Sequence, residues 1–207
     1  MDDNKININK KYIPLDKSWI IRMGVLDIVN GYNDIQTFLS KQENLGDDLL
    51  ALKKVAEEWK SRTIIDVGES GTLYRFLKFA SRKLGLNKRF ITQGTLTKRD
   101  INDDPKIINL TQTKLLKLDQ GTSQWASAAV LLGDNERIEN APFKLKLTYE
   151  VIDHWKAQRK RNLSWEPHYD ETILSQMETY LKILNKEEVK FVPKQAEDFC
   201  FAYILAT

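Results

Sequence analysis

A strand, a polar turn and a helix follow one another four times along this chain, and this repetition constrains the fold more than any other feature. The first unit spans residues 10–31, with its turn at 16–18, and the second spans 62–85, with its turn at 68–72. The third spans 113–134, with its turn at 120–124, and the fourth begins at 188. Gly31, Gly85 and Gly133 are placed to end the first three helices.

Two further helices are predicted between these units. Residues 46–62 form an amphipathic pattern, because Leu49, Leu52 and Val55 fall at helical spacing after two aspartates that suit a helix start. Residues 170–184 form a second long helical pattern. Since strands alternate with helices, we expect an α/β (α+β) domain of repeated strand–turn–helix units, with sheets packed around buried helices.

Cations in the first helical turns predict a binding site for anions. A helix begins with free backbone N–H groups and a partial positive charge, so a lysine or arginine there is unfavourable unless an anion is near. Lys17 and Arg22 flank Ser18 in the first unit, and Arg75 follows Thr72 in the second. These residues indicate a pocket for an acid with several negative charges, although Arg22 and Arg75 pairing with neighbouring carboxylates stays an open alternative.

The composition and the residue spacing disfavour membrane-spanning, metal-binding and RNA-binding proteins. The net charge is +3 and the single cysteine is Cys200, which suits a reducing compartment and a cytoplasmic protein. No apolar run has the roughly 18 residues that a membrane span needs. His154 and His168 lack metal-ligand spacing, so neither a metal nor a cofactor is expected. We expect the basic segment 156–162 to be a solvated loop rather than an RNA contact.

The turns resemble the motifs of 5-enolpyruvylshikimate-3-phosphate (EPSP) synthase, in order and in spacing. The motif G-D-K-S-x-x-x-R is similar to residues 15–22, S-D-D to 46–48, and N-A-G-T-x-x-R to 69–75. The segment T-G-x-x-x-x-x-R-P-I is similar to 92–94 and 98–101, and S-S-Q to 122–124. Lysine followed by serine in the first motif distinguishes this family from the related transferase that acts on UDP-N-acetylglucosamine, which has lysine followed by asparagine.

The resemblance implies an enolpyruvyl transfer of the shikimate pathway, which leads to aromatic amino acids. Phosphoenolpyruvate would be joined to the 5-hydroxyl of shikimate 3-phosphate, and phosphate would be released. Lys17 would contact both substrates and take part in proton transfer as the catalytic residue. The substrate-binding residues that the resemblance implies are Lys17, Ser18, Arg22, Gly71, Thr72, Arg75, Arg99, Thr122, Ser123 and Gln124.

The resemblance also implies a missing partner. The family chain is about twice as long and binds its substrates between two domains. Residues 13–190 would form the N-terminal domain, and 1–12 and 191–207 would lead to a second domain that this sequence lacks. A separate C-terminal-half polypeptide is therefore a possible partner, and we expect no turnover by this chain alone. The region between Ile101 and Asp119 is shorter than in the family, and Asp100 stands where the family has proline.

Three interpretations stay open on these grounds. The chain is either half of an EPSP synthase or a diverged, non-catalytic protein that retains an anion pocket. A third interpretation is a protein of the same fold with another role, such as RNA-end chemistry, but the sequence makes nucleic acid the less favoured partner.

Overall fold

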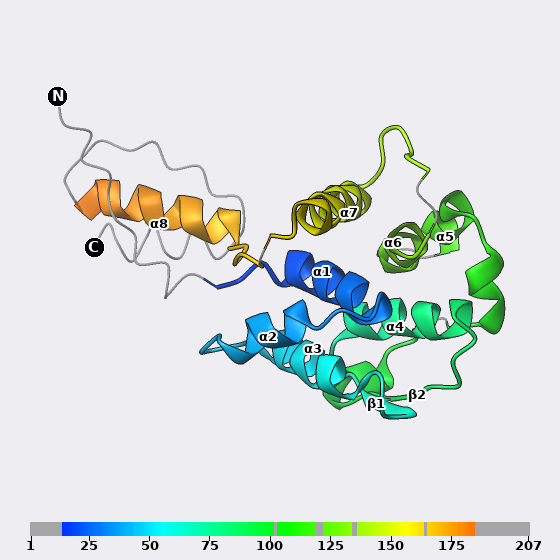
Figure 1. Ribbon diagram of the computed structural model, residues 1–207. Coiled ribbons are helices and arrows are strands. Elements are labelled where there is room, and N and C mark those ends of the chain that lie inside the picture. The colour runs from blue at the N-terminus through cyan, green and yellow to red at the C-terminus, as the bar shows by residue number, and fades with distance from the viewer. Residues whose placement is uncertain (1–13, 102, 119–121, 134–135, 164, 185–207) are drawn as a thin grey trace. The chain divides into compact units, whose positions relative to one another are not determined.

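The computed structural model describes residues 14–101, 103–118, 122–133, 136–163 and 165–184 (Figure 1). Residues 17–168 form one compact unit, and the described residues 14–16 and 169–184 belong to a second. The segments expected to lead to a further domain, 1–12 and 191–207, lie outside the described residues. The fourth strand–turn–helix unit and Cys200 lie outside them as well.

The smaller unit contains helix α8, Glu171–Leu184, which confirms the long helix predicted at 170–184. Asp170 caps this helix, because its carboxylate accepts hydrogen bonds from the backbone N–H groups of Thr172 and Ile173. Of the strand predicted before residue 16, residues 10–13 lie outside the described residues, and Leu15 forms an antiparallel bridge with Tyr169.

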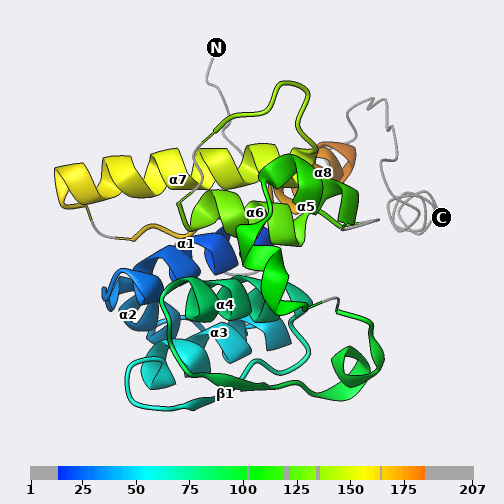
Figure 2. The same ribbon diagram turned by 90° about the vertical axis from the view of Figure 1, so that its right-hand side faces the viewer.

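The larger unit is built mainly from helices. In chain order its longer elements are α1 (Lys17–Val29), α2 (Asp34–Ser40), α3 (Asp47–Glu58), β1 (Ile64–Asp66), α4 (Gly71–Lys83), β2 (Arg89–Ile91), α5 (Gln112–Leu118), α6 (Gln124–Leu131) and α7 (Phe143–Arg161). Two short 3-10 helices, η2 (Gly94–Lys98) and η3 (Pro105–Asn109), lie between β2 and α5. Figure 2 shows α7 along one side, then α6 and α1, then α4 and α3, with β1 at the opposite edge.

Helix α1 lies in the centre of this unit. Its residues from Ile20 to Ile28 are buried without a break, and it contacts α2, α3, α4 and α7. Gly24 permits the close packing, because a Cβ atom there would lie 2.9 Å from side-chain atoms of both Ile35 and Leu52. A helix that is buried on all sides is apolar all round, and the IIRMGVLDIV sequence of α1 fits this description except at the charged residues Arg22 and Asp27.

Three helices start together and run in the same direction. Ser18 and Lys144 meet at the starts of α1 and α7, and Arg22 meets Thr148 one turn later. Near the far ends, the buried Asp27 carboxylate accepts hydrogen bonds from Trp155 and Arg159. Lys17 likewise pairs with Asp48 at the start of α3.

The predicted α/β (α+β) architecture is wrong. Among the described residues the only sheet has two parallel strands, β1 and β2, with Ile65 opposite Phe90. The second unit does form the predicted strand, turn and helix, since β1 is followed by α4. The third unit has helix α5 where its strand was predicted, and among the described residues helices rather than sheets surround α1.

Two local predictions also differ from the structure. The strand expected near residue 113 is helix α5, in which Gln112 and Leu115 are buried one helical turn apart and Leu115 packs in the core. Leucine and lysine, which dominate this segment, are strong helix formers. The basic segment 156–162 is not a loop, because it forms the last two turns of α7 and ends at Asn162 in the left-handed conformation.

Candidate functional site

The starts of five helices lie at one end of the larger unit. The ion pair between Lys17 Nζ and Asp48, at 2.7 Å, joins the first turns of α1 and α3. The hydrogen bond from Lys144 Nζ to Ser18 Oγ, at 3.2 Å, joins α1 and α7. Gln124 joins the first turns of α6 and α4. The N-terminal ends of several helix dipoles therefore point toward the same region.

Gln124 is the centre of the junction between α4 and α6. Its side-chain oxygen accepts a hydrogen bond from Arg75 at 2.5 Å, and its side-chain nitrogen donates to Thr72 Oγ1 at 2.7 Å. Its backbone N–H donates to Thr122 Oγ1 at 3.2 Å. Four residues predicted for the site thus form one hydrogen-bonded group, although the sequence separates them into two motifs about 50 residues apart.

Gly71 and Ser123 lie beside this group. A Cβ atom at Gly71 would lie 3.1 Å from a terminal nitrogen of Arg75, so the glycine leaves room for the guanidinium group. Ser70 caps α4 by accepting a hydrogen bond from the backbone N–H of Leu73. Ser123 precedes α6 and is buried, but its side chain does not cap that helix. The turns of the second and third units therefore lie side by side.

Arg22 is buried below the start of α1, with 1% of its surface exposed. Its Nε donates to Thr148 Oγ1 at 2.8 Å, and one terminal nitrogen donates to the Ser18 carbonyl oxygen at 2.7 Å. The guanidinium group also lies over the ring of Phe76 on α4. These contacts give Arg22 a role in joining α1 to α7 and α4, and direct contact with a ligand stays a prediction.

Two lysines lie next to Ser18: Lys17 precedes it in the chain, and Lys144 donates a hydrogen bond to its hydroxyl oxygen. The Lys17 side chain is 60% exposed, and its charge is balanced by Asp48. Lys144 is the second residue of α7 and is exposed. The sequence analysis missed Lys144, although a lysine in the first turn of a helix is the same signal that drew attention to Lys17. The proton-transfer role of Lys17 stays a prediction.

Arg99 follows η2 and is linked to the turn before α4 through Thr95 and Glu69. The Glu69 carboxylate accepts hydrogen bonds from the backbone N–H and the hydroxyl of Thr95, both at 2.9 Å. These hydrogen bonds hold the pKa of Glu69 below its usual range. Arg99 in turn donates to the Thr95 hydroxyl at 2.9 Å. The segment that carries Arg99 is therefore fastened to the turn before α4.

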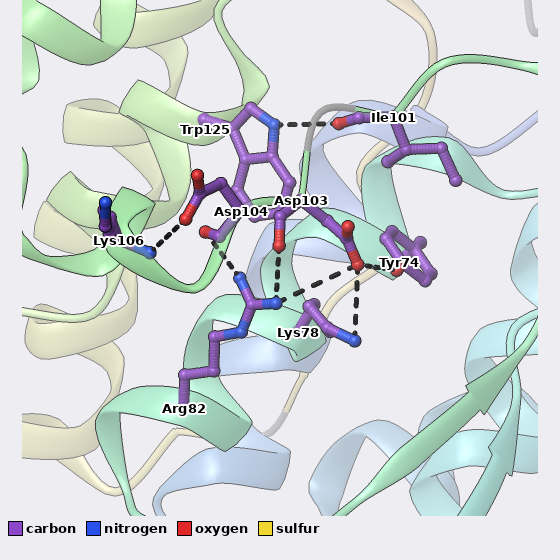
Figure 3. Close-up of polar contacts among 8 residues, drawn as sticks. All are labelled: Tyr74, Lys78, Arg82, Ile101, Asp103, Asp104, Lys106 and Trp125. Atoms are coloured by element: carbon purple, nitrogen blue, oxygen red, sulfur yellow. Dashed lines mark hydrogen bonds and ion pairs between the residues drawn. The ribbon is translucent and has the colours of Figure 1, made fainter.

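Asp103, in the segment that follows Arg99, connects this segment to one face of α4 by hydrogen bonds and ion pairs (Figure 3). Its carboxylate accepts a hydrogen bond from Tyr74 at 2.7 Å and pairs with Lys78 at 3.3 Å. Arg82 donates to the backbone carbonyl of Asp103, and also lies within ion-pair distance of its carboxylate. The sequence analysis missed this cluster, although Tyr74, Lys78 and Arg82 recur at helical spacing on one face of α4.

The sequence predicted neither a metal site nor a membrane-spanning helix, and the described part of the chain can be searched for both. Among the residues that the structure describes, no group of three or more His, Cys, Asp or Glu side chains is placed to hold a metal ion. Within the same residues, no helix combines the length and the apolar character that crossing a membrane requires.

Comparison with known proteins gave no significant similarity: no family model matches the chain, and neither a curated protein nor a solved structure matches it.

Proposed function

We propose that residues 17–168 bind small acids that carry both a phosphate and a carboxylate, namely shikimate 3-phosphate and phosphoenolpyruvate. The chain would act as the substrate-binding half of an EPSP-synthase-type enolpyruvyl transferase and would need a second half for turnover. The observation that carries the proposal is the Gln124 junction, in which Thr72, Arg75 and Thr122 form one group. The proposal concerns these helix starts and does not depend on the sheets that the sequence analysis expected.

The electrostatics of this end support an anionic ligand. Backbone N–H groups and the partial positive charge of each helix dipole favour an anion at a helix start. Hydroxyl and amide groups of Ser18, Thr72 and Gln124 provide neutral donors at the same end of the unit. Lys17 adds an ammonium group, which can donate hydrogen bonds to the oxygens of a phosphate. An anion here would also offset the unfavourable position of the first-turn cations.

In this proposal the residues have separate tasks. Thr72, Thr122 and Gln124 orient the ligands by hydrogen bonds, and Gly71 lets a ligand approach the backbone. Lys17 neutralises charge between the two substrates and serves as the acid or base in the addition and elimination steps. For that task Lys17 has to leave Asp48, and the bound anions provide the competing charge.

One observation favours the second candidate function, a non-catalytic anion-binding protein. Lys17 is already paired with Asp48, and the Arg22 guanidinium is bonded to Thr148 and to the Ser18 carbonyl. Both residues thus have structural partners, which a binding protein without catalysis would tolerate. The two functions differ in whether a candidate C-terminal half restores product formation.

Calorimetric titration of the full chain with shikimate 3-phosphate, and then with phosphoenolpyruvate, tests the proposal. We expect Lys17→Ala and Gln124→Ala each to weaken binding about tenfold or more, equivalent to about 1.4 kcal/mol. Lys160→Ala is the matched control, because Lys160 is an exposed lysine near the opposite end of α7. The proposal is wrong if neither ligand binds at millimolar concentration, or if all three variants bind as the wild type does.

A further inference from the structure

We infer that Trp19, His154 and His168 form a pH-sensitive clasp, which holds the segment after α7 against α1 until both imidazole rings carry a proton. This conformational device goes beyond the proposed function and does not depend on any ligand. The contacts that carry the inference are ring contacts. The His168 ring stacks on the Trp19 ring at a centroid distance of 4.1 Å, and the His154 ring meets the same indole in a T-shaped arrangement at 5.4 Å.

The clasp joins three elements of the larger unit. The indole lies in the first turn of α1, one imidazole lies on α7, and the other belongs to His168, which ends the segment 165–168. His168 is also the last residue of the larger unit. The same segment has a ring contact between Trp165 and Phe38 on α2, at 5.5 Å. Since that contact contains no titratable group, the imidazole of His168 makes the attachment of the segment sensitive to pH.

A first and a second proton have opposite effects on these contacts. A single imidazolium stacked on an indole is attracted by the electron-rich aromatic face, so a proton on His168 alone leaves the clasp closed. A second proton on His154 places two positive charges beside one indole ring, and like charges repel. In agreement with this, burial and the charge of His168 hold the pKa of His154 below its ordinary value of 6.5.

The surrounding charged groups leave this repulsion in place. Glu166 raises the pKa of His154, but burial and His168 outweigh it. Beyond His168, the Asp170 carboxylate caps α8, and Glu171 lies in the first turn of that helix, where the helix dipole attracts it. Three acidic and three basic residues lie within one helical turn of Trp19 or His154, so they add no net charge: Asp16, Glu150, Asp153, Lys17, Arg22 and Lys156.

The direction of the pH effect follows from the lowered pKa of His154. The unfolded chain binds this proton near the ordinary pKa of 6.5, whereas the closed clasp binds it only at a lower pH. The contribution of His154 to stability is therefore complete above about pH 6.5 and is lost as the pH falls through the lowered pKa. We expect residues 165–168 to leave α1 in this acidic range. Helices α1 and α7 stay joined through the hydrogen bond between Arg22 and Thr148, which does not titrate there.

The experiment is an NMR titration of the full chain, whose two histidines are His154 and His168. The ring protons of His168 report the clasp directly, because the ring current of a stacked indole displaces them upfield. The displacement is measured against the urea-unfolded chain at the same pH. We expect it at about pH 8 and expect its loss at about pH 5. We also expect His154 to titrate below pH 6.5 in the wild type and closer to 6.5 in His168→Gln.

Variants separate the clasp from general effects of acid. The double variant His154→Gln with His168→Gln should lose less stability to urea between about pH 8 and about pH 5 than the wild type loses. Lys156→Gln is the matched control, because Lys156 is exposed on α7 two residues from His154, and it should keep the wild-type pH dependence. Circular dichroism at about pH 8 verifies that both variants fold.

Three results would each overturn the inference. In the first, the His168 ring protons keep their upfield displacement at about pH 5. In the second, His154 titrates at pH 6.5 or above in the wild type. In the third, the histidine-free variant loses as much stability on acidification as the wild type does.

Discussion

The buried hydrogen bond between Arg22 and Thr148 provides a direct test of how the candidate site is held together. A double-mutant cycle with Arg22→Ala, Thr148→Val and the double variant isolates this contact. Valine keeps the volume of Thr148 and removes its hydroxyl. The Arg22 side chain is 1% exposed and Thr148 is fully buried, so water cannot replace the lost partner.

The magnitude follows from the contacts that each variant removes. Arg22→Ala removes a charged hydrogen bond to Thr148, another to the Ser18 carbonyl, and the contact with the Phe76 ring. Hydrogen bonds to charged groups contribute about 1.5–3 kcal/mol each, and burial of the guanidinium costs part of this gain. We therefore expect Arg22→Ala to lower the free energy of unfolding by about 3–5 kcal/mol. Arg22→Met should lose less, because it fills the space without burying a charge.

The free energy of unfolding is measured by urea denaturation, followed by tryptophan fluorescence and circular dichroism. We expect the double variant to be less destabilised than the sum of the single variants, by about 1–2 kcal/mol. Arg62→Ala is the control, because Arg62 is exposed in the same unit, and it should change stability by less than about 0.5 kcal/mol. A coupling energy near zero, or Arg22→Ala as stable as Arg62→Ala, would refute the structural role of Arg22.

Two further predictions concern the segment that leads away from α4. Burial raises the pKa of Asp103, but the hydrogen bond from Tyr74 and the charge of Lys78 outweigh this and hold it below its ordinary value of 3.8. Its stabilising effect is therefore present above about pH 4 and is lost as the pH falls through the lowered pKa. Asp103→Asn should unfold at lower urea than the wild type at pH 7, with a smaller difference at pH 3, and an equal difference at both would contradict the assignment. Gly94 has a φ of +51° and a Cβ atom there would lie 1.9 Å from a Glu69 carboxylate oxygen, so Gly94→Ala should cost about 1–2 kcal/mol or more. Gly46→Ala, where nothing lies within 4 Å, is the control, and equal unfolding midpoints of the two variants would disprove the strain.

The sequence predicted helices better than strands, and particular residues explain why. Helix α3 was confirmed because Leu49, Leu52 and Val55 are buried on one face, as their spacing indicates. The pattern of 113–118 was interpreted as a strand, yet Leu115 is buried in a helix that packs on α6. A short apolar run fits either periodicity, and only tertiary packing decides between them.

The candidate site was predicted in part. The motifs at 69–75 and 122–124 do meet, since Arg75 and Gln124 are hydrogen-bonded. Lys144 and Glu69 were missed as organising residues, because their partners Ser18 and Thr95 lie far away in the sequence. Asp103 was missed for the same reason. A side chain that acts through a distant partner leaves no local pattern in a single sequence.

Helix starts and sheets differ in how locally they are encoded. The start of α4 requires only that Ser70 caps the helix and that Gly71 leaves room beside Arg75. A sheet requires partner strands from elsewhere in the chain, and β1 finds one only in β2 among the described residues. Pairing Thr72 with Gln124 needs two helices to begin side by side, which a helical unit provides as well as a sheet does. The binding proposed for these helix starts therefore depends on the Gln124 junction and not on the architecture around it, which makes Gln124→Ala the variant that distinguishes a ligand site from a set of capped helices.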